Sequence, residues 1–516
     1  MGRVSLNFTG KLTAPASVGV PSDLRYIAPD ASGTAYNGKT ILTVDQAIDN
    51  LNRTGGIWNV NGHSTITYSF LDKGPGGVYH NPHETYLAGL VQDFTPFSPE
   101  QRDAARASIQ LWDDLIAPSF KEINGKGADI VMMNTGDGGP AQAAAWIPDQ
   151  HGKYGKTNGD VYVNGDQPDN YDLYYGGYGQ TTITHELGHA IGLSHTGDYN
   201  FAVGGNITYE HDAEFFQDTY QYSIMSYFSS AYSGADGYVN WATGGYYQTP
   251  QTPMIHDIAA VQSMYGADLT TRTGDTTYGF NSTAGNAVYD FTQNKDPFLS
   301  IYDAGGKNDT LDLSGFTGGH AVVDLRPGAF STGYNYGNTA ELNATWGWNY
   351  SDAIWHGIYD GVYASQGYPA FLTENIGIAY NTIIENGVTG AGTDTLQGND
   401  VGNRLDGGAG NDTYTGALGD DVFAVSQIGY TDRITDFVVG HDKIDLTKID
   451  ANASASGDQA FTFIGDGAFT GHAGELHTSI DGAGVNYLSG DVNGDGHADF
   501  MIQLGTVHVG QPDIIV

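Results

Sequence analysis

The sequence has no cysteine, few basic residues and no long apolar run. Without cysteine, no disulfide stabilises the chain. Only 20 lysine and arginine residues stand against 59 aspartate and glutamate residues, so nucleic acid is a poor partner, because phosphates are bound by lysine and arginine. No segment is apolar for long enough to span a membrane, and residues 1–30 lack the apolar core of a signal peptide. The protein therefore either stays in the cytoplasm or leaves the cell by a route that reads no N-terminal signal.

The excess of acidic residues gives a formal net charge of -39. Such a charge fits a solvated surface, and it also fits a protein that binds many divalent cations through carboxylates. Calcium commonly stabilises extracellular proteins that have no disulfides. The positions of the aspartates decide between these interpretations. At 516 residues the chain exceeds one ordinary core, so we expect two domains.

A histidine motif over residues 185–195 has the spacing of a catalytic zinc site. On a helix, His185 and His189 lie one turn apart on the same face and can bind one zinc ion. Gly192 can end the helix in a left-handed conformation and bring His195 round as a third ligand. Three nitrogen ligands leave one coordination position open, as a catalytic zinc requires, and Glu186 is placed to act as the base for a water held there.

A second motif lies downstream of the histidines. A pair of helical histidines with this spacing is common by chance, which gives weight to the sequence Ser223-Ile224-Met225-Ser226-Tyr227. It resembles the Met-turn of the metzincin proteases, a tight turn whose methionine packs beneath the zinc histidines. His211 and His256 lack metal spacing and are expected not to bind zinc. The two motifs together predict a proteolytic zinc site.

The first half of the chain is predicted to be an α+β domain. Residues 1–21 are small and polar and form a leader or a propeptide, and residues 22–266 form the domain itself. Residues 98–101 have the spacing of a capping box and begin a long helix with one apolar face. Residues 144–147 are predicted to form a strand that pairs with an extended substrate, although an ordinary buried edge strand has the same character. A helix closed by Gly266 ends the domain.

Beyond residue 266 the sequence becomes rich in glycine and aspartate. Four nine-residue units follow one another at 389–397, 398–406, 407–415 and 416–424. The third fits the G-G-x-G-x-D-x-U-x repeat, in which glycine turns present carbonyls to calcium and the apolar residue U points inward. A low-complexity linker would not keep this apolar position in every unit. The repeat residues predicted to bind calcium are Asp394, Gly407, Gly408, Gly410, Asp412 and Asp421, while Asn403 replaces the aspartate in the second unit.

Three further stretches stand out. Residues 303–312 are predicted to form another calcium turn near the domain junction. Residues 491–499 resemble the start of an EF-hand loop, but Ile502 stands at the position where a glutamate would complete the loop. A weaker calcium-binding turn and a turn that binds no calcium are therefore equally expected. Residues 335–369 are rich in tryptophan and tyrosine, and we favour packing against the second domain over a ligand-contacting loop.

The zinc motif, the Met-turn sequence and the nonapeptides together resemble the serralysin family of secreted bacterial metalloproteases, over nearly the whole chain from about Ala47 to Val516. The resemblance implies an α+β metzincin-like catalytic domain followed by an all-β parallel β-roll (RTX) domain over residues 267–516. It implies that Tyr227 is an additional zinc ligand that moves away to stabilise the oxyanion. It also implies calcium ligands at Arg272, Gly274, Thr276, Asp303, Gly305, Asp309 and Glu385.

The resemblance also accounts for the missing signal peptide. Family members carry an uncleaved C-terminal signal for a type I exporter, often an acidic residue followed by three apolar ones, and this chain ends in Asp513-Ile514-Ile515-Val516. Because calcium is scarce inside cells, we expect the roll to fold after export. Two positions depart from the family pattern: Thr196 stands where proline is usual, and Lys307 is inserted in the calcium turn that begins at Asp303.

These observations predict a secreted, extracellular zinc endopeptidase that acts as a monomer on proteins or peptides. It would contain one catalytic Zn²⁺ and several structural Ca²⁺ ions. The main alternative is a calcium-dependent adhesin or surface-layer protein with a vestigial zinc site, which the intact Glu186 disfavours. An exported lipase is a further alternative, but the sequence has no G-x-S-x-G nucleophile elbow.

Overall fold

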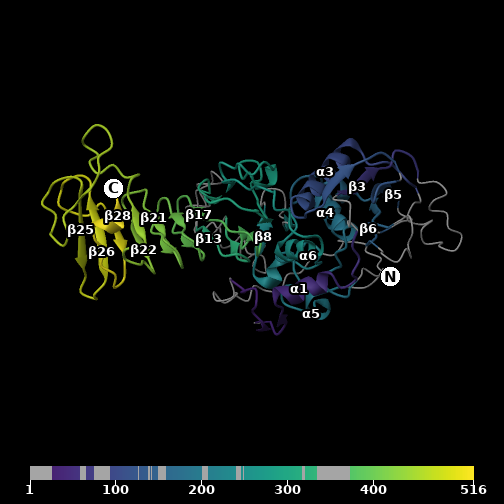
Figure 1. The fold of residues 1–516 in the computed structure, drawn as a ribbon, viewed down its shortest axis with the longest axis horizontal. Helices are drawn as coiled ribbons and strands as arrows, with labels where there is room; N and C mark the ends of the chain where they lie inside the picture. Colours follow the sequence, from purple (N-terminus) through teal and green to yellow (C-terminus); the bar gives the residue numbers. More distant parts are fainter. Residues whose placement is uncertain are drawn as a thin grey trace, which may run out of the picture.

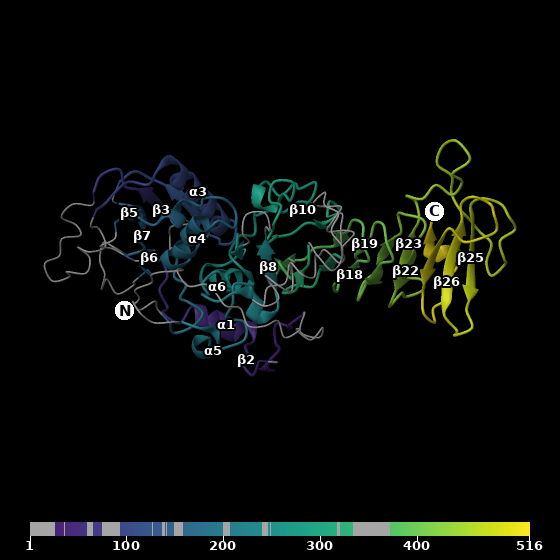
Figure 2. The ribbon, with the colours of Figure 1, turned by 180° about the vertical axis from the view of Figure 1, so that it is seen from behind.

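The computed structural model describes residues 26–35, 37–58, 65–74, 93–125, 127–136, 140, 142–148, 158–199, 207–239, 246–247, 249–316, 320–333 and 372–516. The molecule is elongated, with the helices gathered toward one end and short strands following one another toward the other (Figure 1). The view from behind shows the same arrangement (Figure 2). The predicted leader, residues 1–21, and the aromatic stretch, residues 335–369, lie outside the described residues. No helix among the described residues is long and apolar enough to cross a membrane.

A five-stranded sheet and the longer helices form the first half of the chain. The sheet order is β4 (Ser119–Glu122), β3 (Thr65–Phe70), β5 (Ile130–Thr135), β7 (Val161–Asn164) and β6 (Ala143–Ala145). Its neighbouring strands are parallel except for β6, which pairs antiparallel with β7 at the edge. The helices are α1 (Val44–Leu51), α3 (Pro99–Asp113), α4 (Tyr178–Ala190), α5 (Tyr209–Asp212) and α6 (Ile255–Tyr265). Short elements join them: β1 (Gly33–Thr34), β2 (Thr40–Ile41), η4 (Pro168–Tyr171), η5 (Ser230–Ser233), β8 (Asp236–Val239) and β9 (Tyr246–Tyr247).

Helix α3 begins where the capping box predicted. The Ser98 hydroxyl accepts a hydrogen bond from the Gln101 backbone N–H at 3.2 Å, and the Gln101 side-chain oxygen accepts one from the Ser98 N–H at 3.0 Å. The buried face of α3 packs on α4, where the Trp112 indole N–H donates to the Thr184 carbonyl at 3.1 Å. Helix α3 therefore backs the helix that carries the zinc motif.

Two facing sheets of short strands form most of the second half. The seven-stranded sheet is parallel throughout, in the order β10 (Thr277–Gly279), β12 (Thr310–Asp312), β17 (Asn386–Val388), β19 (Arg404–Asp406), β21 (Val422–Ala424), β23 (Lys443–Asp445) and β28 (Ile514–Ile515). The eight-stranded sheet has the order β13 (Val322–Asp324), β18 (Thr395–Gln397), β20 (Thr413–Thr415), β22 (Thr431–Ile434), β27 (Phe500–Gln503), β26 (Asn486–Asp491), β25 (Glu475–Ile480) and β24 (Thr462–Phe463).

The nonapeptide units alternate between these two sheets. Each unit contributes one strand, in the chain order β18, β19, β20 and β21. The apolar residue of each unit is buried in the shared core: Leu396, Leu405, Tyr414 and Phe423. This alternation fits the predicted β-roll. The eight-stranded sheet is mixed toward β24, because β26 pairs antiparallel with both β25 and β27. The sequence predicted only parallel strands here. The reason is local: the turn after β26 returns the chain beside it as a hairpin, an arrangement that the nonapeptide period does not encode.

Contacts cross the predicted domain boundary at residue 266. A three-stranded sheet is made of β11 (Leu299–Ile301), β16 (Ile376–Ile378) and β14 (Phe330–Ser331), and β15 (Leu372–Thr373) pairs with β8 of the first half. The remaining short helices are η7 (Ala287–Tyr289) and η10 (Gln511–Asp513). The two halves therefore share backbone hydrogen bonds as well as side-chain packing.

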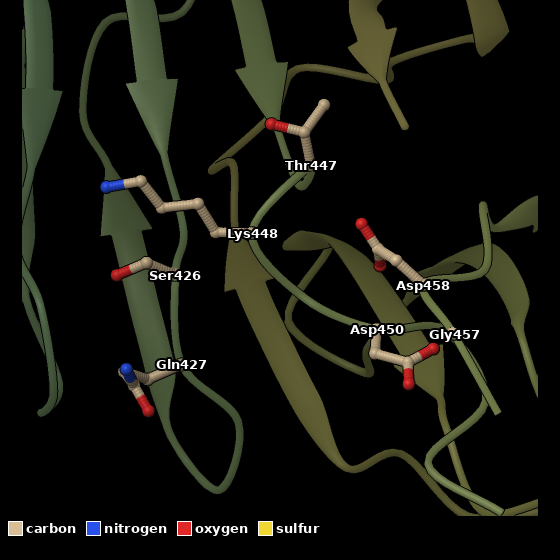
Figure 3. Close-up of a pocket in the computed structure, with 7 residues that line it drawn as sticks. All are labelled: Ser426, Gln427, Thr447, Lys448, Asp450, Gly457 and Asp458. Carbon is tan, nitrogen blue, oxygen red and sulfur yellow. The ribbon is translucent and has the colours of Figure 1, made fainter. Parts of the chain in front are cut away.

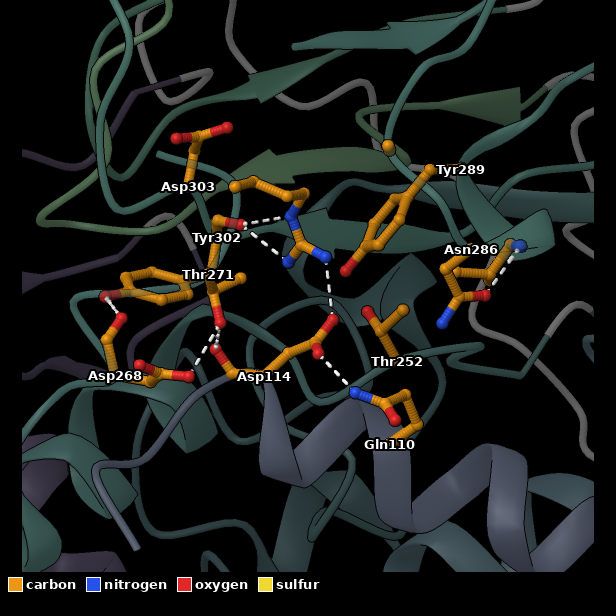
Figure 4. A network of polar contacts seen from close by, with 12 residues as sticks. Gln110, Asp114, Thr252, Asp268, Thr271, Asn286, Tyr289, Tyr302 and Asp303 are labelled. Carbon is orange, nitrogen blue, oxygen red and sulfur yellow. Dashed lines mark hydrogen bonds and ion pairs between the residues drawn. The ribbon is translucent and has the colours of Figure 1, made fainter. Parts of the chain in front are cut away.

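An ion pair fastens this junction (Figure 4). The Arg272 guanidinium lies 2.7 Å from the Asp114 carboxylate at the end of α3, and it also donates to the Tyr302 carbonyl at 2.9 Å. The ring of Tyr289 lies 5.2 Å from the guanidinium carbon. The side chains of Arg272 and Asp114 are only 10% and 16% exposed, so water screens the pair weakly.

Replacing Arg272 by methionine is expected to destabilise the protein by about 3 kcal/mol, because it leaves the Asp114 carboxylate buried without its cation. The exposed pair of Arg106 and Glu122 offers the control, since breaking such a pair costs at most about 1 kcal/mol. Melting temperatures in saturating calcium would measure both. Equal shifts for Arg272→Met and Arg106→Met would contradict a special role for the junction pair.

Candidate metal centre

Helix α4 and the turn after it bring the three predicted histidines together. His185 and His189 lie on α4, and their ring centroids are 4.8 Å apart. Gly192 has φ +120°, and a Cβ at this position would lie 2.1 Å from the Gly56 carbonyl oxygen. Glycine is therefore required where the chain turns back. The turn places the His195 ring centroid 4.6 Å from that of His189.

Hydrogen bonds fix the tautomer of each ring. Every Nδ1 lies within 3.1 Å of a backbone carbonyl oxygen, which can only accept a hydrogen bond. Each Nδ1 therefore carries the hydrogen, and each Nε2 keeps a lone pair. The carbonyl partners of His185, His189 and His195 are those of Ile224, Leu193 and Tyr199, in that order.

The arrangement of the Nε2 atoms fits a cation. The ligand atoms of the three buried histidines lie within 4.8 Å of one another. The Nε2 atoms of His189 and His195 are 3.0 Å apart although neither carries a hydrogen, and His185 Nε2 has no hydrogen-bond partner among the described residues. Burial lowers the pKa of His185 to about 4 and those of the other two well below the usual value. Neutral imidazoles with converging lone pairs are the form that binds zinc.

Glu186 and Tyr227 lie in the same buried region. Neither carboxylate oxygen of Glu186 has a hydrogen-bond partner among the described residues, and burial raises its pKa well above the ordinary value. The Tyr227 hydroxyl likewise has no partner in the described structure, and its ring centroid lies 4.5 Å from that of His195. Burial, followed by the charge of Glu186, raises the pKa of Tyr227. The structure thus gathers all five residues predicted for the zinc site.

The Met-turn packs against the zinc helix. A Cβ at Gly188 would lie 2.7 Å from Met225 Sδ, so the glycine makes room for the methionine. The buried Asp257 on α6 holds the turn by accepting from the Ser223 hydroxyl at 2.6 Å and the Ile224 N–H at 2.7 Å. No motif in the sequence indicates this role of Asp257. Among the described residues, neither His211 nor His256 belongs to the histidine cluster.

The calcium residues predicted near the junction form a connected group. Asp309 accepts from the Thr276 N–H at 2.7 Å, and Glu385 accepts from the Asp309 N–H at 2.9 Å. The Thr276 hydroxyl donates to the Gly274 carbonyl at 2.8 Å, and Asp303 accepts from the N–H of Gly305 at 2.8 Å. Burial, together with the nearby carboxylates of Asp303 and Glu385, raises the pKa of Asp309 to about 7. One oxygen of Asp309 is buried without a hydrogen-bond partner in the described structure.

The inserted Lys307 does not break this group. Its backbone N–H donates to the Asp275 carboxylate at 3.1 Å, and the Asn308 N–H donates to the same oxygen at 3.2 Å. The extra residue is therefore accommodated on the outer side of the turn. Arg272 is the member whose side chain points away from this group, toward Asp114.

Aspartates form a ladder along each edge of the roll. On one edge Asp412 accepts from the Asp394 N–H at 2.8 Å, and on the other Asp421 accepts from the Asn403 N–H at 2.8 Å. Burial, together with the neighbouring aspartates, raises the pKa of Asp412 to about 8 and that of Asp421 to about 6. The second oxygen of Asp412 is buried without a hydrogen-bond partner among the described residues.

The predicted glycines pack tightly beside this ladder. A Cβ at Gly408 would lie 2.0 Å from the Gly390 carbonyl oxygen, and one at Gly410 would lie 1.4 Å from that of Gly392. A Cβ at Gly407 would lie 2.4 Å from the Asp412 carboxylate. Each ladder also extends past the fourth unit, since Asp432 and Asp442 accept from the N–H groups of Asp412 and Asp421 at 3.0 Å. These two aspartates were not predicted as calcium ligands, because the regular nine-residue period ends before them.

A hollow of about 600 Å³ lies elsewhere on the roll (Figure 3). It is lined by Ser426, Gln427, Thr447, Lys448, Asp450, Gly457 and Asp458. Its lysine is paired with the Asp406 carboxylate at 2.8 Å. None of the residues predicted for catalysis lines this hollow.

Comparison of the sequence with known proteins assigns the chain to a family. Residues 267–340 and 368–516 match the family described as Peptidase M10 serralysin C terminal. The metalloprotease AprA of Pseudomonas entomophila is 36% identical over 499 residues, which cover 92% of this chain and 90% of that protein. Serralysin G of Dickeya chrysanthemi is 31% identical over 93% of this chain and 92% of its own length. Serralysin of Proteus mirabilis is 32% identical, with 88% and 89% covered.

These similarities extend over both halves of the chain, and no relative among them is named as an adhesin or a lipase. The buried histidine cluster fits the zinc site that a metalloprotease requires. The chain belongs to the serralysin family and is a zinc metalloendopeptidase.

Proposed function

We propose that this zinc metalloendopeptidase cleaves proteins outside the cell, with Glu186 as general base and Tyr227 as oxyanion stabiliser. One observation carries the proposal: three Nε2 lone pairs converge in a buried site. In the same site the Glu186 carboxylate and the Tyr227 hydroxyl have no hydrogen-bond partner among the described residues. His185, His189 and His195 would hold the metal. Zinc, when bound, polarises the scissile carbonyl and lowers the pKa of a water to about 7.

Glu186 then moves the protons. Its carboxylate accepts a proton from the attacking water and later gives it to the leaving amine. Because it is buried and has no hydrogen-bond partner in the described structure, it is free to make both transfers. Burial also raises its pKa, which makes it a stronger base than an exposed carboxylate.

Strand β6 offers the backbone for substrate binding. It is the edge strand of the five-stranded sheet, so one row of its N–H and C=O groups faces away from β7. An extended peptide would add to this edge as a further strand and bring its scissile bond across the zinc site. The strand covers residues 143–145, where the sequence predicted 144–147, and all three residues are buried.

Replacing Tyr227 by phenylalanine is expected to lower kcat/KM about 100-fold, since one donor to the oxyanion is lost. Zinc affinity should fall by less than tenfold, because the three histidines keep the metal. Steady-state cleavage of a fluorogenic peptide and competition with a zinc chelator would measure the two effects. Tyr232→Phe, in the neighbouring 3-10 helix η5, is the control and should change neither.

We assign calcium to both acidic regions of the second half. The group near the junction would hold it through the backbone carbonyl of Arg272 and through Gly274, Thr276, Asp303, Gly305, Asp309 and Glu385. The roll turns would hold it through the glycine carbonyls at 407, 408 and 410 and the carboxylates of Asp394, Asp412 and Asp421. Clustered carboxylates with raised pKa values support this assignment, because a divalent cation removes their mutual repulsion.

The remaining organisation follows the family resemblance. Residues 22–266 would form a metzincin-type catalytic domain, residues 267–516 the calcium roll, and residues 1–21 a leader or propeptide. The last four residues would be read by a type I exporter, and the secreted enzyme would act as a monomer. Nucleic acid has no place in this function, because the chain has a formal net charge of -39.

Casein cleavage by the purified protein tests the proposed function. We expect cleavage in calcium and zinc, and its loss when a zinc-selective chelator is added. Export of the full chain and of a chain lacking residues 513–516 through a type I system would test localisation. A protein that binds zinc and calcium but cleaves no unfolded protein would contradict the proposed roles of Glu186 and Tyr227.

A further inference from the structure

A buried carboxylate, Asp218, lies directly behind the zinc site. One of its oxygens accepts hydrogen bonds from three hydroxyl groups: those of Thr196, of Tyr199 at 2.7 Å and of Ser226 at 2.8 Å. Asp218 is completely buried, and its second oxygen has no hydrogen-bond partner among the described residues. By accepting three hydrogen bonds, Asp218 connects the segments that supply the three hydroxyl groups.

Two of the hydroxyls come from the loop that carries the third histidine. Thr196 directly follows His195. The Tyr199 carbonyl accepts from His195 Nδ1 at 3.1 Å, and the Tyr199 ring stacks on the His195 ring with centroids 5.8 Å apart. Asp218 therefore holds two residues that follow His195 in the same loop.

The third hydroxyl comes from the Met-turn. Ser226 directly precedes Tyr227, whose ring centroid lies 4.5 Å from that of His195 and 5.1 Å from that of Tyr199. The same carboxylate oxygen thus links His195 and Tyr227, which come from different segments of the chain. The position of Asp218 therefore affects the distance between His195, the proposed metal ligand, and Tyr227, the proposed oxyanion donor.

The backbone of the histidine loop is also held by hydrogen bonds that do not involve Asp218. The Arg53 guanidinium donates to the carbonyls of His195 and Gly197, the second at 2.8 Å, and the Ser194 N–H donates to the Leu51 carbonyl at 2.8 Å. Closing the loop therefore does not depend on Asp218. A buried carboxylate is costly unless it is well hydrogen-bonded, which indicates a role beyond loop closure.

We propose that Asp218 is a positioning residue that sets His195 and Tyr227 relative to each other, and that Thr196 is a link particular to this chain. The proposal rests on the proposed roles of His195 and Tyr227. Proline, the residue that the family resemblance leads one to expect at position 196, has no hydroxyl to donate. Thr196 supplies that donor, so the departure from the family pattern strengthens the connection to Asp218.

Zinc affinity tests the proposal. In a Glu186→Gln background, which prevents self-cleavage, competition with a chelator in saturating calcium would give the zinc dissociation constant. Thr196→Val and Asp218→Asn are each expected to weaken zinc binding about tenfold, the usual effect of losing a partner of a metal ligand. Thr196→Ser keeps the hydroxyl and should bind zinc as the unmodified background does.

Two further readouts separate positioning from general loosening. With Glu186 intact, Asp218→Asn should lower kcat while KM changes little, because Tyr227 acts on the oxyanion. The cobalt(II)-substituted protein should show a changed visible spectrum in Thr196→Val but not in Thr196→Ser. Thr219→Val is the matched control: it removes a buried hydroxyl next to Asp218 that bonds to Ser233 Oγ at 2.6 Å.

Equal zinc affinity in Thr196→Val and Thr196→Ser would overturn the proposal, as would an equal loss in Thr219→Val. If Asp218→Asn does not fold, the Thr196 pair still decides. Absence of casein cleavage by the unmodified enzyme would refute the proposed function. A zinc-affinity difference within the Thr196 pair would nevertheless support the positioning role, so the two failures are distinguishable.

Discussion

Replacing Glu186 by glutamine is expected to lower kcat/KM for peptide cleavage by about 100- to 10,000-fold, the range found for general acid–base groups. Glutamine has nearly the same shape but cannot accept the proton of the attacking water. Because the three Nε2 atoms and the carbonyl partners of the Nδ1 atoms are untouched, the variant should still bind one zinc ion per chain. Casein cleavage and metal counting on the same preparation would measure both properties.

The control is Glu210→Gln, which makes the same chemical change on an exposed residue of α5. It should leave both cleavage and zinc content unchanged. Cleavage by Glu186→Gln at more than about a tenth of the normal rate would contradict the role of general base. Loss of zinc from the variant would instead show that the carboxylate contributes to metal binding.

The zinc residues were predictable because their geometry is local. His185 and His189 are fixed by the helical repeat, and Gly192 is fixed by the left-handed turn that returns His195. Short-range spacing of this kind depends little on the rest of the fold. The apolar positions of the nonapeptides were predictable for the same reason, since each unit is one turn and one strand.

The supports of the site were not predictable, because they are contacts between distant segments. Arg53 reaches the loop of the third histidine from 142 residues away, and Asp257 reaches the Met-turn from 33 residues away. Neither residue belongs to a motif with its partner. Asp432 and Asp442 were missed for another reason: the ladder spacing changes from 18 residues to 20 and 21 after the fourth unit, although the hydrogen bonds continue unbroken.

Removing calcium is expected to unfold the second half of the chain at a much lower temperature. Each ladder stacks buried aspartates on successive turns, and no lysine or arginine is bonded to the ladder residues Asp412 or Asp421 in the described structure. Without a cation these carboxylates repel one another in a region that water reaches poorly. A site present only in the folded protein contributes about 2.7 kcal/mol when calcium is at 100 times its dissociation constant, and several sites add together.

The substitution Asp412→Asn gives this prediction its sharpest form. Asparagine keeps the oxygen that accepts from the Asp394 N–H but removes one negative charge. In saturating calcium the variant should melt below the unmodified protein, because it has lost a ligand. In excess chelator the order of the two melting temperatures should reverse or vanish, because the lost charge relieves repulsion.

The control is Asp458→Asn, on the exposed rim of the hollow in the roll, which should melt as the unmodified protein does in both conditions. Scanning calorimetry in the Glu186→Gln background, where no self-cleavage interferes, would record all six transitions. If the unmodified chain melts at the same temperature with and without calcium, the roll does not need calcium to fold. Its acidic residues would then act only as surface charge.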